Sequence, residues 1–459
     1  MDRPRGLMRT MGGRRAFRRL SGTATETATV GDMTAEGAGL ATVAGKRVFI
    51  DGAIGGEIVS FRRTKARRNY DEAELLAVES ASPERVTPRC RYFGTCGGCA
   101  LQHLSTDGQL RLKEATLREN LRRIGNVEPA EWLIPVSAAP WGYRRRARLA
   151  ARFVDGKGRV LVGFSERDSS WVADMDSCET LHPRAAALIV PLGELISSLG
   201  IARRVPQVEI VVADNATALV LRVLDDPATD DLARLRSFRT AHDCRLLLQR
   251  AGPDDIRGLD PATDEGDLWY DIDGVRLRFG PTDFIQVNAA VNQALVERVL
   301  EEFDPQPDSR LLDLFCGIGN FTLPLARRAA HVLGVEADKR MVALAAQNAA
   351  TNGIVAASFV AADLSSSAGG TVFATTPWDG VLLDPPRAGA AAILAPVAAT
   401  GTRRIVYVSC HPGTLARDAG TLVHEFGFRL VRAGIFDMFP ATSHVESLAV
   451  FERSGRSAS

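Results

Sequence analysis

A cysteine stands where an apolar run stops and a helical pattern begins, in the segment IVYVSCHPGTLARD (residues 405–418). Free cysteine is usually a small, buried, hydrophobic residue, and for an isolated thiol that is the commoner role. The second interpretation is that Cys410 is a nucleophile. The helix that follows would point its positive dipole end at the thiol, and we expect this to lower the thiol pKa and raise the thiolate fraction.

A carboxylate that could serve as a general base lies in the C-terminal segment FDMFPATSHVESLAVFER. Glu446 stands between the turn PATSH and the apolar run SLAVF, so we expect it at the start of a strand. A general base is one role for such an acid, and an exposed acid at a strand start is the alternative. We interpret the nearby His444 as a positioning or structural residue.

Five apolar runs between residues 310 and 410 end in or near a polar or reactive residue, and helical stretches alternate with them. This alternation predicts an α/β fold with a Rossmann-like parallel sheet flanked by helices. The ends of parallel strands share one edge of such a sheet, and ligands bind outside that edge. The five runs therefore converge on one site. Their polar or reactive residues are Asp313, Glu336, Asp363, Asp384 and Cys410.

The ligand of this site is expected to carry a ribose. The turn Gly317–Gly319 lets backbone approach a ligand closely, although a tight structural turn is the alternative. Glu336, at the end of the second run, could accept hydrogen bonds from two ribose hydroxyls. Thr322 stands where the dinucleotide pattern has its third glycine, and this favours S-adenosylmethionine over NAD.

A thiolate, a methyl donor and a base together indicate methylation at C5 of uracil. C5 is a poor nucleophile, but addition of a thiolate to C6 makes it enolate-like and able to attack a sulfonium methyl group. A base then removes the C5 proton and the thiol leaves, so that one hard step is divided into easier ones. Asp384 precedes two prolines in LDPPRAG, a rigid turn that would fix its carboxylate at the pocket mouth.

Three cysteines form a C-x5-C-x2-C pattern, Cys90, Cys96 and Cys99, in a chain with seven cysteines. An odd number in a long chain favours metal binding or catalysis over a disulfide framework. Four thiolates would suit zinc or an iron–sulfur cluster equally by count, and the residues alone leave this choice open. Cys244 and Cys316 have no evident partner, so we expect them in the core.

The chain of 459 residues is long enough for several domains. We expect a disordered basic extension over 1–24, an oligonucleotide-binding-like barrel over 25–84, a mixed central domain over 85–280 and the cofactor-binding domain over 281–455. Because no apolar run is long enough for a membrane span and no secretory segment follows the arginine-rich start, we expect a cytoplasmic protein without a membrane partner.

Two basic clusters interrupt an otherwise balanced charge distribution with a net charge of +1. They lie at residues 62–68 and 144–148. Such clusters can neutralise RNA phosphates, and a solvated protein face is the equally good alternative for either one.

The segments LLDLFCGIGNFTLPLA, VLLDPPRAGA, YVSCHPGTLARD and FDMFPATSHVESLAVFER together resemble the RNA uracil-C5 methyltransferase family. CRYFGTCGGCALQHL and GLATVAGKRVFIDGAIGGE resemble its branch that acts on large-subunit (23S) ribosomal RNA and carries a TRAM barrel and an iron–sulfur cluster. The resemblance runs from about residue 25 to residue 453. It implies an RNA partner, with ribosomal RNA as the favoured substrate. We expect the enzyme to be a monomer.

The resemblance also implies a role for each matching position. Cys410 would be the nucleophile and Glu446 the base that removes the C5 proton. The positions that match contacts to S-adenosylmethionine are Gln286, Phe315, Asn320, Glu336, Asp363 and Asp384. The ligands of a [4Fe-4S] cluster would be Cys90, Cys96, Cys99 and Cys178. Glu179 follows the last of these where the family usually has proline.

Other functions fit parts of the sequence. Enzymes that methylate exocyclic amines share the Pro-Pro motif but need neither Cys410 nor Glu446, and cytosine-C5 enzymes usually hold their cysteine in another local context. A tRNA uridine-C5 methyltransferase would keep the same chemistry on a different RNA. A non-catalytic RNA-binding iron–sulfur protein would fit the barrel and the basic clusters, but it leaves the cofactor pocket unexplained.

Overall fold

The computed structural model describes residues 18–19, 24–252, 255–260 and 267–453. Contacts divide the chain into two compact units. The first unit contains residues up to 87 together with 103–105, and the second contains 88–102 and the chain from 106 onward. Most of the extension predicted over residues 1–24 lies outside the described residues, and the predicted domain boundaries stay a prediction.

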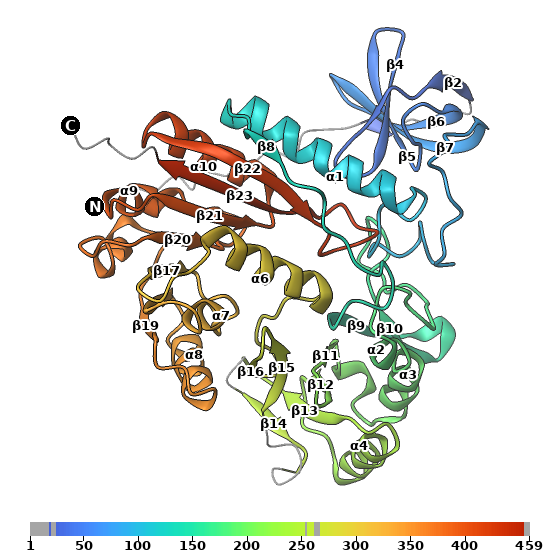
Figure 1. Ribbon diagram of the computed structural model, residues 1–459. Coiled ribbons are helices and arrows are strands. Elements are labelled where there is room, and N and C mark those ends of the chain that lie inside the picture. The colour runs from blue at the N-terminus through green and yellow to red at the C-terminus, as the bar shows by residue number, and fades with distance from the viewer. Residues whose placement is uncertain (1–17, 20–23, 253–254, 261–266, 454–459) are drawn as a thin grey trace, which may run out of the picture. The chain divides into compact units, whose positions relative to one another are not determined.

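The first unit is a barrel-like sheet of short strands, shown in blue in Figure 1. Its strand order is β1-β6-β7-β5-β4-β3, and β2 also pairs with β6. Inward-facing residues such as Val48, Ile50 and Phe61 form its core, as the period-2 pattern requires. This sheet is compatible with the predicted barrel. Its strands are β1 (Arg18–Arg19), β2 (Glu26–Thr29), β3 (Asp32–Met33), β4 (Ala38–Val43), β5 (Lys46–Asp51), β6 (Ile58–Ala66) and β7 (Tyr70–Ser80).

The middle of the second unit is a six-stranded sheet, green in Figure 1, with the order β10-β9-β11-β12-β13-β14. Three helices pack their apolar residues against it, Leu192 and Phe238 among them. The elements are β9 (Arg146–Val154), β10 (Arg159–Gly163), α2 (Pro183–Ala186), α3 (Ile189–Ser198), β11 (Gln207–Val212), β12 (Thr217–Arg222), α4 (Thr229–Ala241), β13 (Arg245–Gln249) and β14 (Ile256–Gly258). Strands β11 and β12 pair antiparallel and form a hairpin around Asp214.

The C-terminal part of the second unit is an eight-stranded sheet with the order β19-β18-β17-β20-β21-β23-β22-β8. Five strands are parallel, and β23 runs antiparallel to both of its neighbours. The predicted α/β fold with a parallel sheet is thereby confirmed. The strands are β8 (Glu131–Trp132), β17 (Arg310–Leu314), β18 (His331–Glu336), β19 (Ala357–Ala361), β20 (Gly380–Leu383), β21 (Arg404–Ser409), β22 (Phe428–Phe436) and β23 (Glu446–Arg453).

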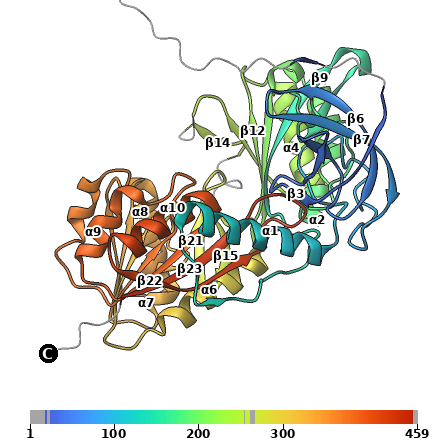
Figure 2. The same ribbon diagram turned by 90° about the horizontal axis from the view of Figure 1, so that it is seen from above.

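Helices cover both faces of this sheet (Figures 1 and 2). One core joins the sheet to α6, α7 and α8, and the other joins it to α1, α9 and α10. The helices are α1 (Thr106–Asn120), α6 (Ala289–Phe303), α7 (Thr322–Ala326), α8 (Lys339–Thr351), α9 (Leu394–Ala399) and α10 (Pro412–His424). A small hairpin, β15 (Leu268–Ile272) with β16 (Val275–Phe279), contributes to the first core.

Helix α1 joins this sheet although it lies far upstream in sequence. It continues through a π-helical turn, Leu121–Gly125, and so ends at a glycine. A Cβ atom on Gly125 would lie 2.4 Å from the Ala416 carbonyl oxygen of α10, so only glycine permits this close approach.

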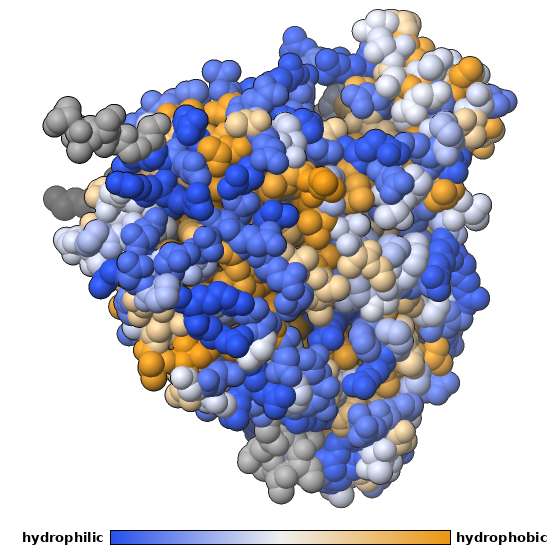
Figure 3. Space-filling model, in the orientation of Figure 1, coloured by the Kyte–Doolittle hydropathy of each residue, from blue (hydrophilic) through white to orange (hydrophobic). Residues whose placement is uncertain are grey.

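Polar side chains dominate the face of the second unit shown in Figure 3, and apolar side chains lie between them in separate patches. In the part of the chain that the structure describes, no helix combines the length and the apolar character that crossing a membrane requires.

Candidate active site

The predicted site residues come together at the carboxyl edge of the parallel strands. Glu336 ends β18, Asp384 directly follows β20, and Cys410 directly follows β21, while Asp363 stands just beyond β19. The strand order reverses between β17 and β20, and such a reversal is where open α/β sheets bind their ligands. The predicted convergence of the five runs is therefore confirmed.

The turn after β17 has a backbone shape that suits a ligand. Gly317 and Gly319 have φ values of +54° and +95°, which glycine adopts at little cost. Phe315 also has a positive φ, +66°, and a bulky residue in this conformation is strained and commonly marks a functional site. A Cβ atom on Gly317 would meet no other atom within 4 Å, so the turn borders open space.

Glu336 is oriented by three backbone amides. Its carboxylate accepts hydrogen bonds from Gly317 at 3.2 Å, from Ala337 at 2.7 Å and from Asp338 at 3.1 Å. These bonds join the end of β18 to the glycine turn and fix the direction of the carboxylate. The open turn, the reversal of strand order and a fixed acid together fit the adenosine portion of S-adenosylmethionine.

Asn320 is held by two residues that the sequence did not single out. Asn292 on α6 exchanges reciprocal 3.0 Å hydrogen bonds with it, and the Tyr270 hydroxyl donates to its carbonyl oxygen at 3.0 Å. Both partners also line a small cavity, of about 60 Å³, together with Gln286. Neither carries a recognisable motif, because each comes from an element whose pattern only indicates a strand or a helix.

Two aspartates beneath this edge have perturbed ionisation. Burial raises the pKa of Asp313 to about 7, an effect to which the nearby charges of Asp384 and Glu336 add. Thr322 donates a 2.5 Å hydrogen bond to one Asp313 oxygen, and the other oxygen has no partner among the described residues. Burial likewise raises the pKa of Asp384 to about 7. The exposed Asp363 differs, since hydrogen bonding to Ser365 lowers its pKa.

Cys410 and Glu446 are brought together by the antiparallel strand. The ladder between β21 and β23 ends with Ser409 opposite Ser447, so the next residue on each strand is Cys410 or Glu446. Glu446 is only 4% exposed, and burial, with the charge of Asp384, raises its pKa well above the usual value. The sequence predicted Glu446 at a strand start; the structure excludes the alternative of an exposed acid.

The expected low pKa of Cys410 is wrong for the protein alone. Burial raises the pKa of this thiol to about 11, and the charges of Glu446 and Asp384 act in the same direction. Helix α10 begins as predicted, but His411 is its N-cap and Cys410 stands outside that cap. The adjacent helix end is a neighbour in sequence, whereas the two carboxylates come from other strands of the sheet, and their charges raise the thiol pKa further.

The four predicted cluster cysteines line one cavity in the central part of the second unit, together with Phe164 and Met175. They lie close enough that the charge of Cys178 contributes to raising the pKa of each of the other three thiols, after burial. The Gly98 amide donates a 3.4 Å hydrogen bond to the sulfur of Cys96, as amides do around iron–sulfur clusters.

Among the described residues, no group of three or more His, Cys, Asp or Glu side chains is arranged to hold one metal ion. The other two non-catalytic cysteines, Cys244 and Cys316, are buried in the cores as expected.

The two basic clusters are largely neutralised within the protein. In the first, Arg62, Arg63, Lys65 and Arg67 form ion pairs with acids of the same sheet. In the second, Arg145 pairs with Asp214, and Arg146 and Arg148 share Glu209. This pairing supports the alternative of a solvated face for most of these residues.

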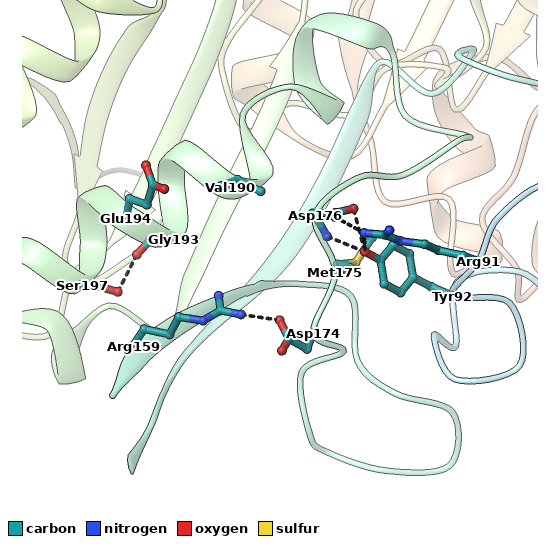
Figure 4. Close-up of a pocket in the computed structure, with 10 residues that line it drawn as sticks. All are labelled: Arg91, Tyr92, Arg159, Asp174, Met175, Asp176, Val190, Gly193, Glu194 and Ser197. Atoms are coloured by element: carbon teal, nitrogen blue, oxygen red, sulfur yellow. Dashed lines mark hydrogen bonds and ion pairs between the residues drawn. The ribbon is translucent and has the colours of Figure 1, made fainter. Parts of the chain in front are cut away.

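A larger cavity lies elsewhere, beside α3 and the segment before Cys178 (Figure 4). Its volume is about 730 Å³, and four of its charged residues form two ion pairs, Arg159 with Asp174 and Arg91 with Asp176. It contains none of the predicted site residues.

The fold and the strand-edge site define a methyltransferase of the Rossmann-like class that uses S-adenosylmethionine. Residues 269–454 match the family described as tRNA (Uracil-5-)-methyltransferase. The 23S rRNA (uracil(1939)-C(5))-methyltransferase RlmD of Methylococcus capsulatus is 50% identical over 420 residues, which cover 91% of this chain and 95% of that protein. The protein of the same name from Nitrosococcus oceani is 49% identical over 430 residues, covering 93% and 96%.

A solved structure shows the same fold. The crystal structure of Pyrococcus abyssi tRNA (uracil-54, C5)-methyltransferase in complex with S-adenosyl-L-homocysteine superimposes with a TM-score of 0.71 at 24% identity, over 93% of this chain and 100% of that one. The chain belongs to the RNA uracil-C5 methyltransferase family. It is an S-adenosylmethionine-dependent enzyme, as predicted.

Proposed function

We propose that the chain methylates C5 of a uridine in 23S ribosomal RNA through a covalent adduct between Cys410 and C6 of the base. One observation carries the mechanism. The antiparallel register sets Cys410 and Glu446 side by side at the open edge of the parallel strands. A nucleophile and a general base that act on adjacent carbons of one ring need this proximity.

Each residue has a distinct task in this proposal. The Cys410 sulfur bonds to C6, and the electron pair of the C5–C6 double bond moves toward C5 and the C4 carbonyl. S-adenosylmethionine supplies the methyl group that C5 accepts. Glu446 then takes the proton from C5, the double bond re-forms, and the thiolate leaves. The raised pKa of Glu446 suits a base that must hold this proton once it has accepted it.

The cofactor contacts are proposed for the residues that border the glycine turn. Glu336 would accept hydrogen bonds from the ribose hydroxyls, and Asp363 stands at the end of the next strand for the adenine. Four further residues border the same edge in the proposed site: Gln286, Phe315, Asn320 and Asp384. The charge of Asp384 acts on both Cys410 and Glu446, and we propose that its side chain also contacts the uracil ring.

A mechanism-based trap tests this proposal. RNA with 5-fluorouridine at the acceptor position has no C5 proton to lose, so the adduct should persist on denaturing gels in the presence of S-adenosylmethionine. Cys410→Ala should abolish both the adduct and methyl transfer while RNA binding remains. Methyl transfer at the wild-type rate by the Cys410→Ala variant would refute the assignment of the nucleophile.

The RNA target is proposed from the relatives, which are named for uracil 1939 of 23S rRNA. Ribosomal RNA from a strain that lacks the gene would be incubated with labelled donor, and the modified nucleotide mapped by mass spectrometry of nuclease fragments. Label at the position equivalent to 1939 supports the proposal. Label in a parallel tRNA reaction, and none in rRNA, would support the tRNA enzyme instead.

We further propose that Cys90, Cys96, Cys99 and Cys178 hold a [4Fe-4S] cluster and that the first unit is a TRAM barrel that binds RNA. The shared cavity and the amide bond to Cys96 support the cluster, and the strand order supports the barrel. The cluster would be structural or contact RNA, because methyl transfer needs no electron. A cytoplasmic location and a monomeric state complete the proposal.

A further inference from the structure

The base Glu446 stands at the last rung of a ladder. Phe436, the last residue of β22, pairs with Glu446, the first residue of β23, and residues 437–445 connect the two strands. The terminal rungs of a ladder open more easily than the interior ones, and a connection of this length is no tight turn. Something other than the ladder must therefore hold the connection if Glu446 is to keep one orientation.

Helix α1 supplies that support from a distant part of the chain. Lys113 donates to the Asp437 carboxylate at 2.6 Å and to the Phe439 carbonyl at 2.9 Å. One turn earlier on the same helix, Gln109 accepts a 2.8 Å hydrogen bond from the Ala441 amide. Figure 1 shows the connection from β22 to β23 reaching the N-terminal half of α1.

The Lys113–Asp437 pair is fully buried, with side chains only 2% and 1% exposed. Burial of two charges costs so much hydration that an apolar pair of similar size is often at least as stable. Stability alone is therefore a weak reason for this pair. The pair does fix the orientation of the Lys113 side chain toward the connection, since the ammonium group must reach a carboxylate and a backbone carbonyl at once.

The residues after Cys99 hold the connection from another side. The amides of Ala100 and Leu101 both donate to the Ala441 carbonyl, at 2.9 and 3.0 Å, and the Gln109 amide group donates to the Leu101 carbonyl at 3.1 Å. Ala441 has a φ of +64°, which a non-glycine residue keeps only where its surroundings impose it. Both polar groups of its backbone are thus engaged.

We propose that Lys113 and Gln109 are positioning residues for the base Glu446. They hold residues 437–445, and so they keep the Glu446 carboxylate directed at the C5 proton. This inference rests on the proposed function, in which Glu446 removes that proton. It assigns to α1 a part in one step of the reaction, proton removal, and none in formation of the bond between Cys410 and C6.

The steps can be separated experimentally with two RNAs. Trapping on 5-fluorouridine RNA needs the nucleophile and the donor but no base, whereas turnover on ordinary RNA needs all three. The Lys113→Met and Gln109→Leu variants should therefore trap the fluorinated RNA at a rate within about twofold of the wild-type rate. On ordinary RNA they should lose about tenfold to hundredfold in turnover, since small misplacements of a catalytic group have such effects. A denaturation-resistant adduct should accumulate.

Matched variants separate positioning from folding. Asp437→Asn alone leaves Lys113 buried without a counter-charge and should lower the melting temperature, and Lys113→Met/Asp437→Asn should recover most of it. The double variant should still accumulate adduct, because the bond to the Phe439 carbonyl is also lost. Arg118→Met, a change of the same kind on the exposed side of α1, should behave as wild type.

Four outcomes are informative. Failure of the wild-type protein to trap fluorinated RNA would remove the proposed function itself, and the inference with it. Normal turnover by both Lys113→Met and Gln109→Leu would overturn the inference alone. The inference would also be overturned if the variants lost trapping of fluorinated RNA in the same proportion as turnover. The same holds if the amount of adduct followed the melting temperature across the variants, because a general structural role predicts both results.

Discussion

Ser409 and Ser447 face each other at the last pair of the ladder between β21 and β23, and the Ser447 hydroxyl donates a 3.1 Å hydrogen bond to the Ser409 carbonyl. This pair sets the register at the place where Cys410 and Glu446 leave the sheet. A slip of one residue would turn every side chain of β23 to the opposite face. The proposed nucleophile and base therefore form a coupled pair, and their ionisation should be coupled as well.

The first prediction concerns the reactivity of Cys410 in the protein alone. Because the thiol pKa is about 11, alkylation by iodoacetamide should rise about tenfold per pH unit between pH 7 and 10. Glu446→Gln removes a carboxylate that raises this pKa, so at pH 9 to 10 the variant should be alkylated about threefold to tenfold faster. Mass spectrometry of the Cys410 peptide measures the rate.

The buried Cys316 provides the internal control for this measurement, because the residue is 6% exposed and the pKa of its thiol is also raised. It should stay slow in both proteins. A pH-independent rate at Cys410, or one already maximal at pH 7, would contradict the raised pKa.

The second prediction concerns stability and pH. The pKa of Asp313 is about 7 in the folded protein and near 3.8 in the unfolded chain. The folded state therefore holds more protons between these values, so the free energy of unfolding should fall as pH rises from about 4 to 7 and level off above. Asp313→Asn removes the ionisable group and keeps an acceptor for the Thr322 hydroxyl. At pH 8 it should stabilise the protein by about 2–4 kcal/mol.

Urea unfolding at pH 5 and pH 8 measures this difference. The gain from Asp313→Asn should be much smaller at pH 5, where the carboxyl is neutral. An equal change at both pH values would mean that packing, and not ionisation, determines the effect.

The third prediction concerns the residues that hold Asn320. Tyr270→Phe removes one hydrogen bond to the Asn320 side chain, and Asn292→Ala removes two. Since a hydrogen bond contributes about 1 kcal/mol, S-adenosylhomocysteine should bind about fivefold more weakly to Tyr270→Phe, and more weakly still to Asn292→Ala. Calorimetric titration measures the Kd. Tyr70→Phe, in the first unit, is the control, and equal affinity in all four proteins would exclude a role for Asn320.

The sequence alone predicted those features that depend on residues close to one another along the chain. The alternation of runs and helices predicted the parallel strands, and the polar residues after them predicted the site edge. It also found Glu446, because a turn and an apolar run flank it. It did not find Tyr270, Asn292 or Lys113, since each acts through a partner from another segment. The pKa of Cys410 was missed for the same reason, because neighbours across the sheet outweigh the adjacent helix end.

The basic clusters show the opposite case, in which ion pairs formed in the fold neutralise a local charge signal whose meaning the sequence left open. Five cations within residues 62–68 suggested a surface for phosphates. The neighbouring strand β7 brings acids opposite four of them, among them Glu72, which pairs with both Lys65 and Arg67. Cross-strand pairing cannot be read from charge counts, so the sequence could not decide between an RNA footprint and a solvated face.

The fourth prediction concerns the four cysteines and what they support. Anaerobic reconstitution with iron and sulfide should give roughly four of each per chain, whereas a zinc site would bind about one ion and no sulfide. Cys178→Ala should lower the iron content. Because the amides after Cys99 hold the Ala441 carbonyl, loss of the cluster should also loosen residues 437–445. Chymotrypsin should then cleave faster after Met438, which is buried in the folded protein and is followed by Phe439.

Cleavage elsewhere distinguishes this local effect from general unfolding. Phe284, 72% exposed, should be cut at the same rate with and without the cluster, and so provides the matched site in the same molecule. Equal acceleration at both sites would indicate that the cysteines stabilise the whole unit. Zinc bound at one ion per chain, with normal protection of Met438 from cleavage, would contradict the cluster while leaving the support of the connection intact. The link between the cysteine loop and Glu446 is carried by backbone amides, so it depends on the fold of that loop and not on electron transfer.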